Sequence, residues 1–375
     1  MAGIYIHIPF CKQACLYCNF HFSTTLKQKN DLIDALLKEI AMTASFAAGE
    51  TIETIYFGGG TPSLLSSDEL RSIFSLLHSK FIIADNAEIT LEANPDDITP
   101  QNLARWKQTG INRLSIGIQS FFEEDLKWMN RAHNAEQALQ CIAEAQQAGF
   151  NNLSVDLIYG TPTLTDENWK YNVDRVLQLQ VPHISCYALT VEPKTALQQF
   201  ISKHKMQDVD PDQQARQFLQ LIYWLNNAGY EHYEISNFSL PGRRSRHNTA
   251  YWQGKTYYGF GPSAHSFNGI NTRSWNIANN ALYIKSINQD ILPVEQETLT
   301  ETQQLNEYIM TSLRTMEGID LIKIKNGFGA HHYTNILKTA ASFTGGNIIL
   351  DDEHIILTNE GKLFADGLAA KLFAD

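Results

Sequence analysis

The chain has 375 residues, 43% of them hydrophobic and 18% charged, and its formal net charge is −11. A chain of this length and apolar content can bury a sizeable core, and we expect more than one domain. The acidic balance speaks against general binding to nucleic acid. No apolar run reaches the roughly 18 residues of a membrane span, and the N-terminus lacks the basic start of a signal peptide. Five cysteines, three of them clustered, indicate a reduced, cytoplasmic protein that uses thiolates to bind metal.

Up to about residue 190, short β-rich runs alternate with segments in which apolar residues have helical spacing. Ser66 and Thr99 are suitable helix N-caps, and Gly110 and Gly149 are suitable helix stops. This alternation predicts an α/β fold of parallel strands, and six such units fit a partial, TIM-like (β/α)6 barrel. A doubly wound sheet is the alternative. The predicted strands are 4–8, 54–58, 88–93, 113–118, 153–158 and 183–189, and the predicted helices are 31–46, 66–81, 99–110 and 135–149.

The pattern changes in the second half of the chain. A helix is predicted over 211–229, and irregular, aromatic-rich sequence follows it. The last part combines helices, a β-hairpin over 346–358 and a helix over 359–373, which together suggest a winged-helix-like unit. Winged helices often bind DNA, but the acidic charge argues against that use here. We expect a barrel over 1–230, a connecting region over 231–290 and a C-terminal domain over 291–375.

Three cysteines, Cys11, Cys15 and Cys18, follow the first predicted strand with the spacing Cys-x3-Cys-x2-Cys. Three thiolates on a four-iron cluster leave one iron open to another ligand. The alternative is a zinc site completed by His7 or His21, although structural zinc sites more often pair two Cys-x2-Cys units. The two remaining cysteines, at 141 and 186, fall in helix and strand patterns and are expected in the core.

Other unusual residues fall where further predicted strands end. They are the glycine-rich turn over 58–62, Glu92, Gln119 and Asp156, and Arg131 follows a little later. Active sites in barrels of parallel strands form at the carboxyl ends of the strands. The glycines would let backbone amides approach a ligand, and the acidic and amide side chains suit ribose hydroxyls or an ammonium group. Their shared position predicts one site that includes the cysteine loop.

The cysteine spacing followed by Gly-Gly-Gly-Thr-Pro resembles the radical S-adenosyl-L-methionine (SAM) superfamily, and the resemblance covers nearly the whole chain. It implies that the three cysteines hold a [4Fe-4S] cluster whose fourth iron is chelated by SAM. The chemistry it implies is one-electron reduction of SAM to methionine and a 5′-deoxyadenosyl radical, for which the protein supplies position and exclusion of water. Matching motifs place Tyr17 beside the cluster and these residues against SAM: Tyr5, Gly59, Gly60, Thr61, Glu92, Gln119, Arg131 and Asp156.

Within the superfamily, the chain looks like the branch that contains oxygen-independent coproporphyrinogen III oxidase and the HemW-type haem chaperones. Three features favour the chaperones. The oxidases have a further cysteine where this chain has Phe20, and they carry an N-terminal extension where only ten residues precede Cys11 here. The run over 247–252 matches the HNxxYW motif that characterises HemW-like proteins.

His247, the histidine of that motif, is a candidate haem ligand, because histidine ligates haem iron and the neighbouring Tyr and Trp can pack on a porphyrin. Arg243, Arg244 and Arg246 are candidates to meet the haem propionates. The alternative is that His247 and its aromatic neighbours pack the open side of the barrel. A GxGxxA string over 259–264 lacks the preceding strand and later acidic residue of a dinucleotide site, so we discount that function.

We therefore expect a haem chaperone that binds a cluster and SAM and transfers haem, its cargo, to apo-haemoproteins. Expected partners are haem or a porphyrin and recipient haemoproteins of respiration or haem storage, with peripheral membrane association as an option. One alternative is radical decarboxylation of coproporphyrinogen III to protoporphyrinogen IX, and a third hypothesis is a radical enzyme that methylates or opens haem. The sequence leaves open whether SAM is cleaved productively, which residue is the second haem ligand, and the oligomeric state.

Overall fold

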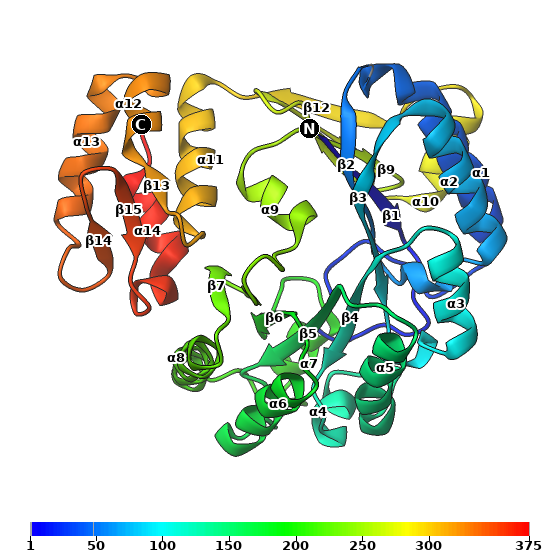
Figure 1. The fold of residues 1–375 in the computed structure, drawn as a ribbon, viewed down its shortest axis with the longest axis horizontal. Coiled ribbons are helices and arrows are strands. Elements are labelled where there is room, and N and C mark those ends of the chain that lie inside the picture. Colours follow the sequence, from blue (N-terminus) through cyan, green and yellow to red (C-terminus); the bar gives the residue numbers. More distant parts are fainter. Residues whose placement is uncertain (1, 48, 375) are drawn as a thin grey trace.

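The computed structural model describes residues 2–47 and 49–374. The first six strands are β1 Ala2–Ile8, β2 Thr51–Gly59, β3 Ile82–Ala93, β4 Arg113–Gln119, β5 Leu153–Tyr159 and β6 His183–Ala188. They are parallel and lie side by side in chain order, so the predicted partial barrel is confirmed. The helices that cover its outer face (Figure 1) are α1 Lys29–Thr43, α2 Ser67–Lys80, α3 Pro100–Gln108, α4 Glu123–Trp128, α5 Ala135–Gln147 and α6 Asp166–Gln178.

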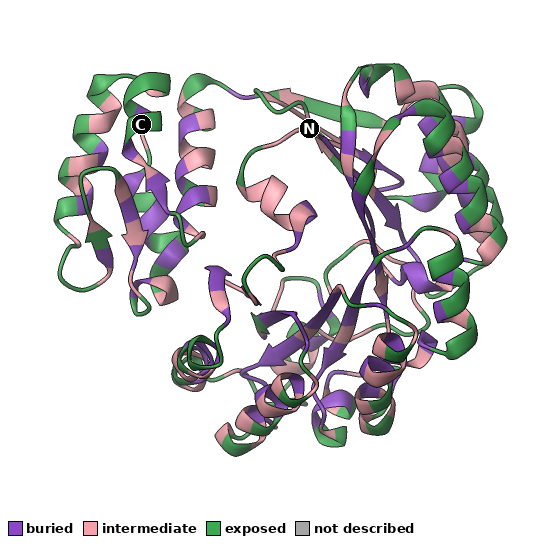
Figure 2. Ribbon diagram, in the orientation of Figure 1, coloured by how far each residue is buried: buried purple, intermediate pink, exposed green. Residues whose placement is uncertain are grey.

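Side chains alternate along these strands between the helices and the barrel interior. In β1, Ile4, Ile6 and Ile8 are fully buried in the core that the helices share, while Tyr5 and His7 take the opposite face. Figure 2 shows these strands buried and the outer helical surfaces exposed. The period of two follows from the pleat of a strand. It leaves the interior lined with polar side chains of the neighbouring strands, among them Thr54, Glu88, Glu92, Arg113, Ser115, Asp156 and Ser185.

The predicted helix ends are confirmed. Ser66 forms a capping box with Glu69 at the start of α2, and the side chain of Thr99 accepts a hydrogen bond at the start of α3. Gly110 and Gly149 follow α3 and α5 with φ angles of 97° and 83°. Because that left-handed conformation favours glycine, these two residues end their helices where the sequence predicts.

The region over 231–290, which we expect to be irregular, instead extends the barrel sheet at both edges. Its elements and their neighbours are α7 Ala196–Ser202, α8 Pro211–Asn227, β7 Glu231–Glu234, β8 Asn237–Ser239, α9 Arg246–Trp252, β9 Tyr257–Phe260, β10 His265–Phe267, β11 Thr272–Asn276, α10 Asn280–Asn288 and β12 Val294–Thr298. Within the described residues the sheet has 12 strands, ordered β12-β11-β10-β9-β1-β2-β3-β4-β5-β6-β8-β7. The added strands pair the backbone groups that an open barrel leaves at its edges. They are three to five residues long, too short for a periodic signal in the sequence.

The C-terminal residues form a second hydrophobic core around Leu305, Ile309, Ile355 and Leu368. Its elements are α11 Glu301–Leu313, β13 Ile319–Asp320, α12 Leu321–Phe328, α13 Ala330–Ala341, β14 Ile348–Leu350, β15 His354–Leu357 and α14 Ala365–Leu372. The predicted hairpin is confirmed as β14 and β15, and β13 joins them in an antiparallel sheet. This order of elements is that of a winged helix.

Polar contacts join the C-terminal unit to the strands beyond β6. Arg314 donates a hydrogen bond to Glu234 at 3.2 Å, and Nζ of Lys362 lies 3.0 Å from Nδ1 of His232. Burial lowers the pKa of Lys362 to about 8 and the pKa of His232 to about 3. The second core is therefore fixed beside the barrel, with α9 between them (Figure 1).

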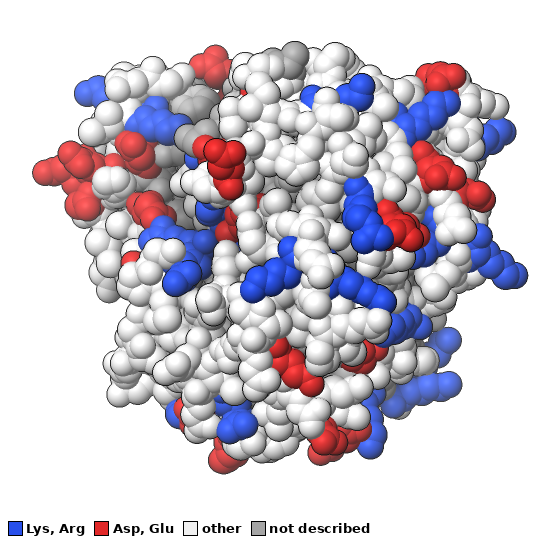
Figure 3. All heavy atoms as spheres, turned by 45° about the vertical axis from the view of Figure 1, so that its right-hand side comes forward, with Lys and Arg blue, Asp and Glu red and all other residues white. Residues whose placement is uncertain are grey.

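Charges of both signs are mixed on the surface. On the face in Figure 3, basic side chains are interspersed with acidic ones over the barrel helices. In the described part of the chain, no helix is long and apolar enough to cross a membrane.

Candidate functional site

The cysteine loop leaves β1 and is fixed at both ends by backbone hydrogen bonds. The amide of Cys11 donates to the carbonyl of Ser23 at 3.0 Å, and the amide of Leu16 donates to the carbonyl of Met129 at 3.1 Å. All three clustered cysteines are partly exposed free thiols, while the cysteines at 141 and 186 are buried in the core as predicted. The loop thus presents three thiols at the carboxyl end of β1.

The glycine-rich turn after β2 holds the start of this loop. The amide of Gly60 donates to the carbonyl of Ile8 at 2.9 Å, and the amide of Thr61 donates to the carbonyl of Phe10 at 2.7 Å. A Cβ atom at Gly60 would lie 2.6 Å from the carbonyl oxygen of Phe10, so any larger residue would push the loop away. We expected the amides of this turn to meet a ligand, but the structure gives these two to the protein itself.

Glu92 lies in the barrel interior beneath this turn. Its carboxylate accepts hydrogen bonds from the hydroxyl of Tyr56 at 2.8 Å and from the amide of Gly59 at 3.2 Å. Burial raises the pKa of Glu92 to about 7, and burial raises the pKa of nearby Asp156 to about 6. Two desolvated carboxyls at one end of the barrel form a site that a cationic ligand would stabilise.

Arg131 connects the cysteine loop to the carboxyl ends of β3 and β4. Its guanidinium donates to Oδ1 of Asn94 at 2.8 Å, to the carbonyl of Gly117 at 2.8 Å and to Sγ of Cys15 at 3.3 Å. Tyr17 lies next to this guanidinium, packed against the same hydrophobic cluster as Leu16.

Gln119 ends β4 with a φ of 68°. A residue other than glycine is held in this left-handed region only when its surroundings require it, and such residues gather at functional sites. An added Cβ at Gly117 would lie 3.0 Å from Nε2 of Gln119 and 3.1 Å from Nη2 of Arg131, so both side chains cross Gly117. The sequence therefore predicts correctly that these residues share one end of the barrel.

Three free thiols suit a four-iron cluster, in which each thiolate binds its own iron, whereas no three of the described His, Cys, Asp or Glu side chains are arranged to hold a single metal ion. Burial raises the pKa of Cys11 and raises the pKa of Cys18 to about 11, so both thiols are protonated at neutral pH unless a metal binds and displaces the protons. The zinc alternative would need His21, whose Nε2 lies 2.7 Å from Oδ1 of Asn280, because both ring nitrogens of His7 already meet partners. They lie 3.1 Å from the hydroxyl of Tyr5 and 3.0 Å from the carbonyl oxygen of His21.

His247 lies inside the barrel, behind the other residues of its motif. It is 2% exposed, and its Nδ1 and Nε2 lie 2.7 Å from Oγ1 of Thr54 and 2.8 Å from the hydroxyl of Tyr251. Its ring stacks on Tyr56 with centroids 5.1 Å apart. The carboxylate of Glu88 accepts the amides of Arg246 and His247 and so fixes the start of α9. In this structure His247 packs the open side of the barrel, as the alternative interpretation expects.

A cavity of about 840 Å³ lies beside the cysteine loop. Tyr251 and Trp252 of the HNxxYW motif form one part of its wall, Phe20 of the cysteine loop forms another, and α11 and α12 of the C-terminal unit contribute Tyr308 and Lys323. The motif therefore faces this cavity with its aromatic residues and not with its histidine.

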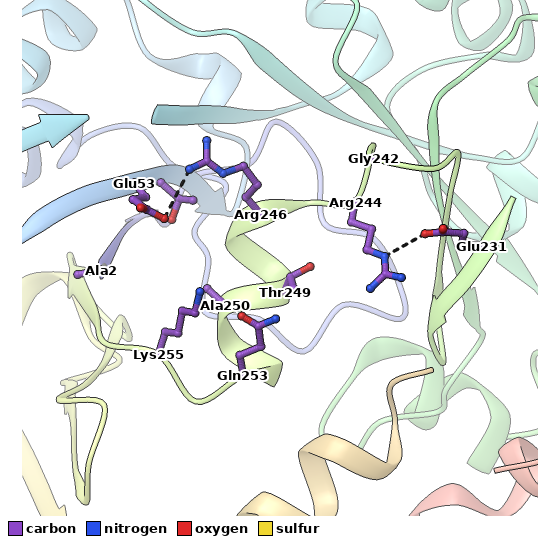
Figure 4. A pocket seen from close by; sticks show the side chains of 11 residues that line it. Ala2, Glu53, Glu231, Gly242, Arg244, Arg246, Thr249, Ala250, Gln253 and Lys255 are labelled. Carbon is purple, nitrogen blue, oxygen red and sulfur yellow. Dashed lines mark hydrogen bonds and ion pairs between the residues drawn. The ribbon is translucent and has the colours of Figure 1, made fainter. Parts of the chain in front are cut away.

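Arg244, just before α9, and Arg246, its first residue, line a different cavity, of about 480 Å³ (Figure 4). There Arg244 is paired with Glu231 and with Glu317, and Arg246 lies 3.6 Å from Glu53. The structure therefore places Arg244 and Arg246, two of the candidates for the haem propionates, at a cavity that Tyr251 and Trp252 do not line.

Comparison with known proteins agrees with this geometry. The model of the radical SAM superfamily matches residues 5–176. The chain is 33% identical to the heme chaperone HemW of Mycobacterium tuberculosis (strain CDC 1551 / Oshkosh), over 99% of this chain and 94% of that protein. It is 31% identical to the heme chaperone HemW of Bacillus subtilis (strain 168), over 98% of this chain and 97% of that protein. The chain belongs to the HemW family of the radical SAM superfamily.

A solved structure extends the HemW family assignment to the fold. Coproporphyrinogen III oxidase (HemN) from Escherichia coli, a radical SAM enzyme, superposes with a TM-score of 0.86 at 25% identity and covers 100% of this chain and 90% of its own. Membership of the superfamily implies a [4Fe-4S] cluster and SAM as cofactors.

The structure adds residues to this HemW site that the sequence analysis missed. Tyr56 holds Glu92, Asn94 holds Arg131, and Lys12 pairs with Asp96 at 2.7 Å to fix the cysteine loop to the turn that follows β3. The alternation of side chains along β2 could have identified Tyr56, because a residue two positions before the glycine-rich turn faces the barrel interior. Nothing in the sequence places the C-terminal residues against the cavity, because that contact depends on how two cores pack.

Proposed function

We propose that this chain is a haem chaperone that binds haem in the 840 Å³ cavity and passes it to apo-haemoproteins. The observation that carries the proposal is the position of Tyr251 and Trp252, which form the wall of that cavity beside Phe20 of the cysteine loop. Aromatic side chains suit the flat apolar face of a porphyrin. Membership of the HemW family, whose curated members are named heme chaperones, supports the same function.

Cys11, Cys15 and Cys18 would hold the cluster, and the cluster would supply a one-electron donor and an open iron for SAM. Glu92 and Asp156 would then meet the cationic part of SAM, because a positive charge favours the ionised form of both buried carboxyls. The remaining contacts that we propose for SAM are Tyr5, Gly59, Gly60, Thr61, Gln119 and Arg131, with Tyr17 beside the cluster. The amides of Gly60 and Thr61 are bonded to Ile8 and Phe10, so these two residues would meet SAM through their other atoms.

The cavity has the charge and size that haem needs. Pockets of about 300–1,000 Å³ are typical of bound cofactors, and this one falls in that range. Haem carries two carboxylates, and the cavity wall includes Arg273 and Lys323. Arg273 is already paired with Glu297 at 2.6 Å and with Glu307 at 2.9 Å. Lys323 lies 4.0 Å from the ring centroid of Tyr308 and forms no ion pair among the described residues, so we propose it as the propionate contact.

The position of Phe20 favours carrying haem over oxidising a porphyrinogen. Phe20 stands where the oxidases have a further cysteine, and it is 67% exposed at the cavity wall. An exposed aromatic side chain there adds apolar surface for a flat ligand. The alternative function is decarboxylation of coproporphyrinogen III. It deserves a direct test because the solved oxidase structure superposes on this chain.

The deciding experiment uses anaerobically reconstituted full-length protein. We expect uptake of one haem per chain, followed by transfer to a haem-free cytochrome that becomes functional only after loading. The parallel assay supplies coproporphyrinogen III, SAM and a reductant. Formation of protoporphyrinogen IX at a catalytic rate, with no stable haem binding, would replace the chaperone with the oxidase.

A further inference from the structure

Haem iron in proteins needs at least one axial ligand, and the proposed haem cavity is lined by three histidines, His7, His21 and His265. The histidine of the HNxxYW motif is not among them. A ligand to haem iron must offer a ring nitrogen with a free lone pair, at a position that leaves room for the porphyrin plane. These requirements separate the four histidines.

Two of them are already committed. Nε2 of His7 lies 3.0 Å from the carbonyl oxygen of His21 and therefore carries its proton, and its Nδ1 lies 3.1 Å from the hydroxyl of Tyr5. Both ring nitrogens of His247 have partners within 2.8 Å, and the side chain lies behind Tyr251. Neither ring can bind iron without breaking a hydrogen bond that is at least partly buried.

His21 has one free nitrogen in an unfavourable place. Its Nε2 lies 2.7 Å from Oδ1 of Asn280, so the proton on this nitrogen points at α10. The nitrogen that remains is Nδ1, which is bonded next to the carbon that carries Cβ. A porphyrin bound at that nitrogen would be crowded by the histidine's own Cβ and backbone, whereas Nε2 lies at the open end of an imidazole ring.

His265 meets both requirements. Neither of its ring nitrogens has a hydrogen-bond partner among the residues that the structure describes, and the side chain is exposed at the cavity wall. It begins β10 and pairs across the sheet with Trp275 of β11. The two rings stack with centroids 6.0 Å apart and planes 28° apart, and Trp275 is in turn held by Glu295 at 3.2 Å. The ring is therefore oriented without using either nitrogen.

The glycines of the GxGxxA string build this position. A Cβ at Gly259 would lie 2.0 Å from the carbonyl oxygen of His265, and a Cβ at Gly261 would lie 2.5 Å from the carbonyl oxygen of His7. Gly261 also has a φ of 98°. The string therefore lets the turn from β9 to β10 fold back against β1, which brings His265 beside the cysteine loop.

We propose that His265, and not His247, is the protein ligand to the iron of haem bound in this cavity. The inference rests on the proposed function, because it needs haem in the cavity. It gives the GxGxxA string a role in haem binding. It also assigns the HNxxYW motif to the aromatic wall, with its histidine as a positioning residue for Tyr251.

The test compares His265→Ala, His21→Ala and His247→Ala in the full-length protein loaded with haem. Absorption and electron paramagnetic resonance spectra report whether an imidazole nitrogen is bound to iron. We expect the imidazole signature in wild type, in His21→Ala and in His247→Ala, and its loss in His265→Ala. Haem should dissociate from His265→Ala about tenfold faster or more. Replacing a residue that only supports a metal ligand already weakens metal binding by about tenfold, and loss of the ligand itself should cost at least as much.

A chemical rescue separates ligand loss from misfolding. His265→Gly with added imidazole should regain the nitrogen-ligated spectrum, while the same addition should not change His247→Ala. An imidazole signature that persists in His265→Ala, or that disappears only in His21→Ala or His247→Ala, overturns the inference and leaves the chaperone function standing. Wild-type protein that takes up no haem overturns the proposed function itself.

Discussion

Nε2 of His247 lies 2.8 Å from the hydroxyl of Tyr251, one helical turn further along α9. The other ring nitrogen is occupied by Thr54 of β2, so the histidine links the barrel wall to the tyrosine that faces the cavity. Gly3 makes room for it, because a Cβ there would lie 3.3 Å from the His247 ring. A histidine and a tyrosine four residues apart can therefore act together through a hydrogen bond that positions the tyrosine, a role that needs no metal.

Replacing His247 should cost stability. His247→Ala removes one buried and one partly buried hydrogen bond and leaves Thr54 without its partner, so we expect a loss of about 2–4 kcal/mol in the free energy of unfolding. Denaturant titration measures it. His78→Ala, at an exposed site on α2, is the matched control and should change the free energy by less than about 0.5 kcal/mol. Equal effects of the two variants would contradict the structural role of His247.

The cluster should depend on the three loop cysteines and on no others. After anaerobic reconstitution, Cys11→Ala, Cys15→Ala and Cys18→Ala together should abolish bound iron and sulfide and the cluster absorbance. The control is Cys186→Ala, which changes a buried core cysteine and should retain both. A triple variant that keeps its iron and sulfide would show that the cluster is held elsewhere.

Glu92 should make stability and SAM binding depend on pH. Its folded pKa is about 7 and its ordinary value is 4.5, so between these values the folded state holds a proton that the unfolded state releases. The stability of the wild type should therefore fall, relative to Glu92→Gln, as pH rises from about 4.5 to about 7. The difference should change by up to about 1.4 kcal/mol per pH unit.

The same carboxyl predicts tighter SAM binding as pH rises through about 7, because ionised Glu92 attracts a cation. Denaturant titrations at several pH values and calorimetry with SAM measure the two effects. Glu167→Gln, on α6, controls for the loss of a carboxylate away from the barrel interior. If the stability curves of the wild type and Glu92→Gln run parallel, Glu92 does not carry the raised pKa.

Gly60 should be needed because the start of the cysteine loop lies too close to it for a side chain, and not because glycine makes the backbone flexible. A methyl group there meets the backbone carbonyls of Phe10 and Ile8 at 2.6 and 2.8 Å, so Gly60→Ala must displace the start of the loop. We expect a cost of about 1–3 kcal/mol and poor cluster assembly, measured by unfolding and by iron content. Gly346→Ala has no atom within 4 Å of the new methyl and should leave both unchanged. Full cluster content in Gly60→Ala would contradict the role of this contact.

The fold of the first half follows from local patterns, whereas the additions to its sheet do not. The six long strands alternate apolar and polar residues and are separated by capped helices. The sequence therefore predicts both that Ile4 is buried in the core and that Glu69 lies at a helix start. Strands β7 to β12 form mainly because the edges of the barrel have unpaired backbone groups. No residue within these strands indicates that pairing, so the sequence does not predict them.

The sequence by itself determined that three thiols, a glycine turn and polar strand ends share one end of a barrel. It could do so because the carboxyl ends of parallel strands always meet at one edge. The tertiary structure alone decided what each residue faces. A histidine such as His247 carries no local sign of whether it meets solvent, iron or a neighbouring hydroxyl. The contacts with Thr54, Glu88 and Tyr251 decide the environment of His247. The GxGxxA string over 259–264 brings His265 to the cavity instead.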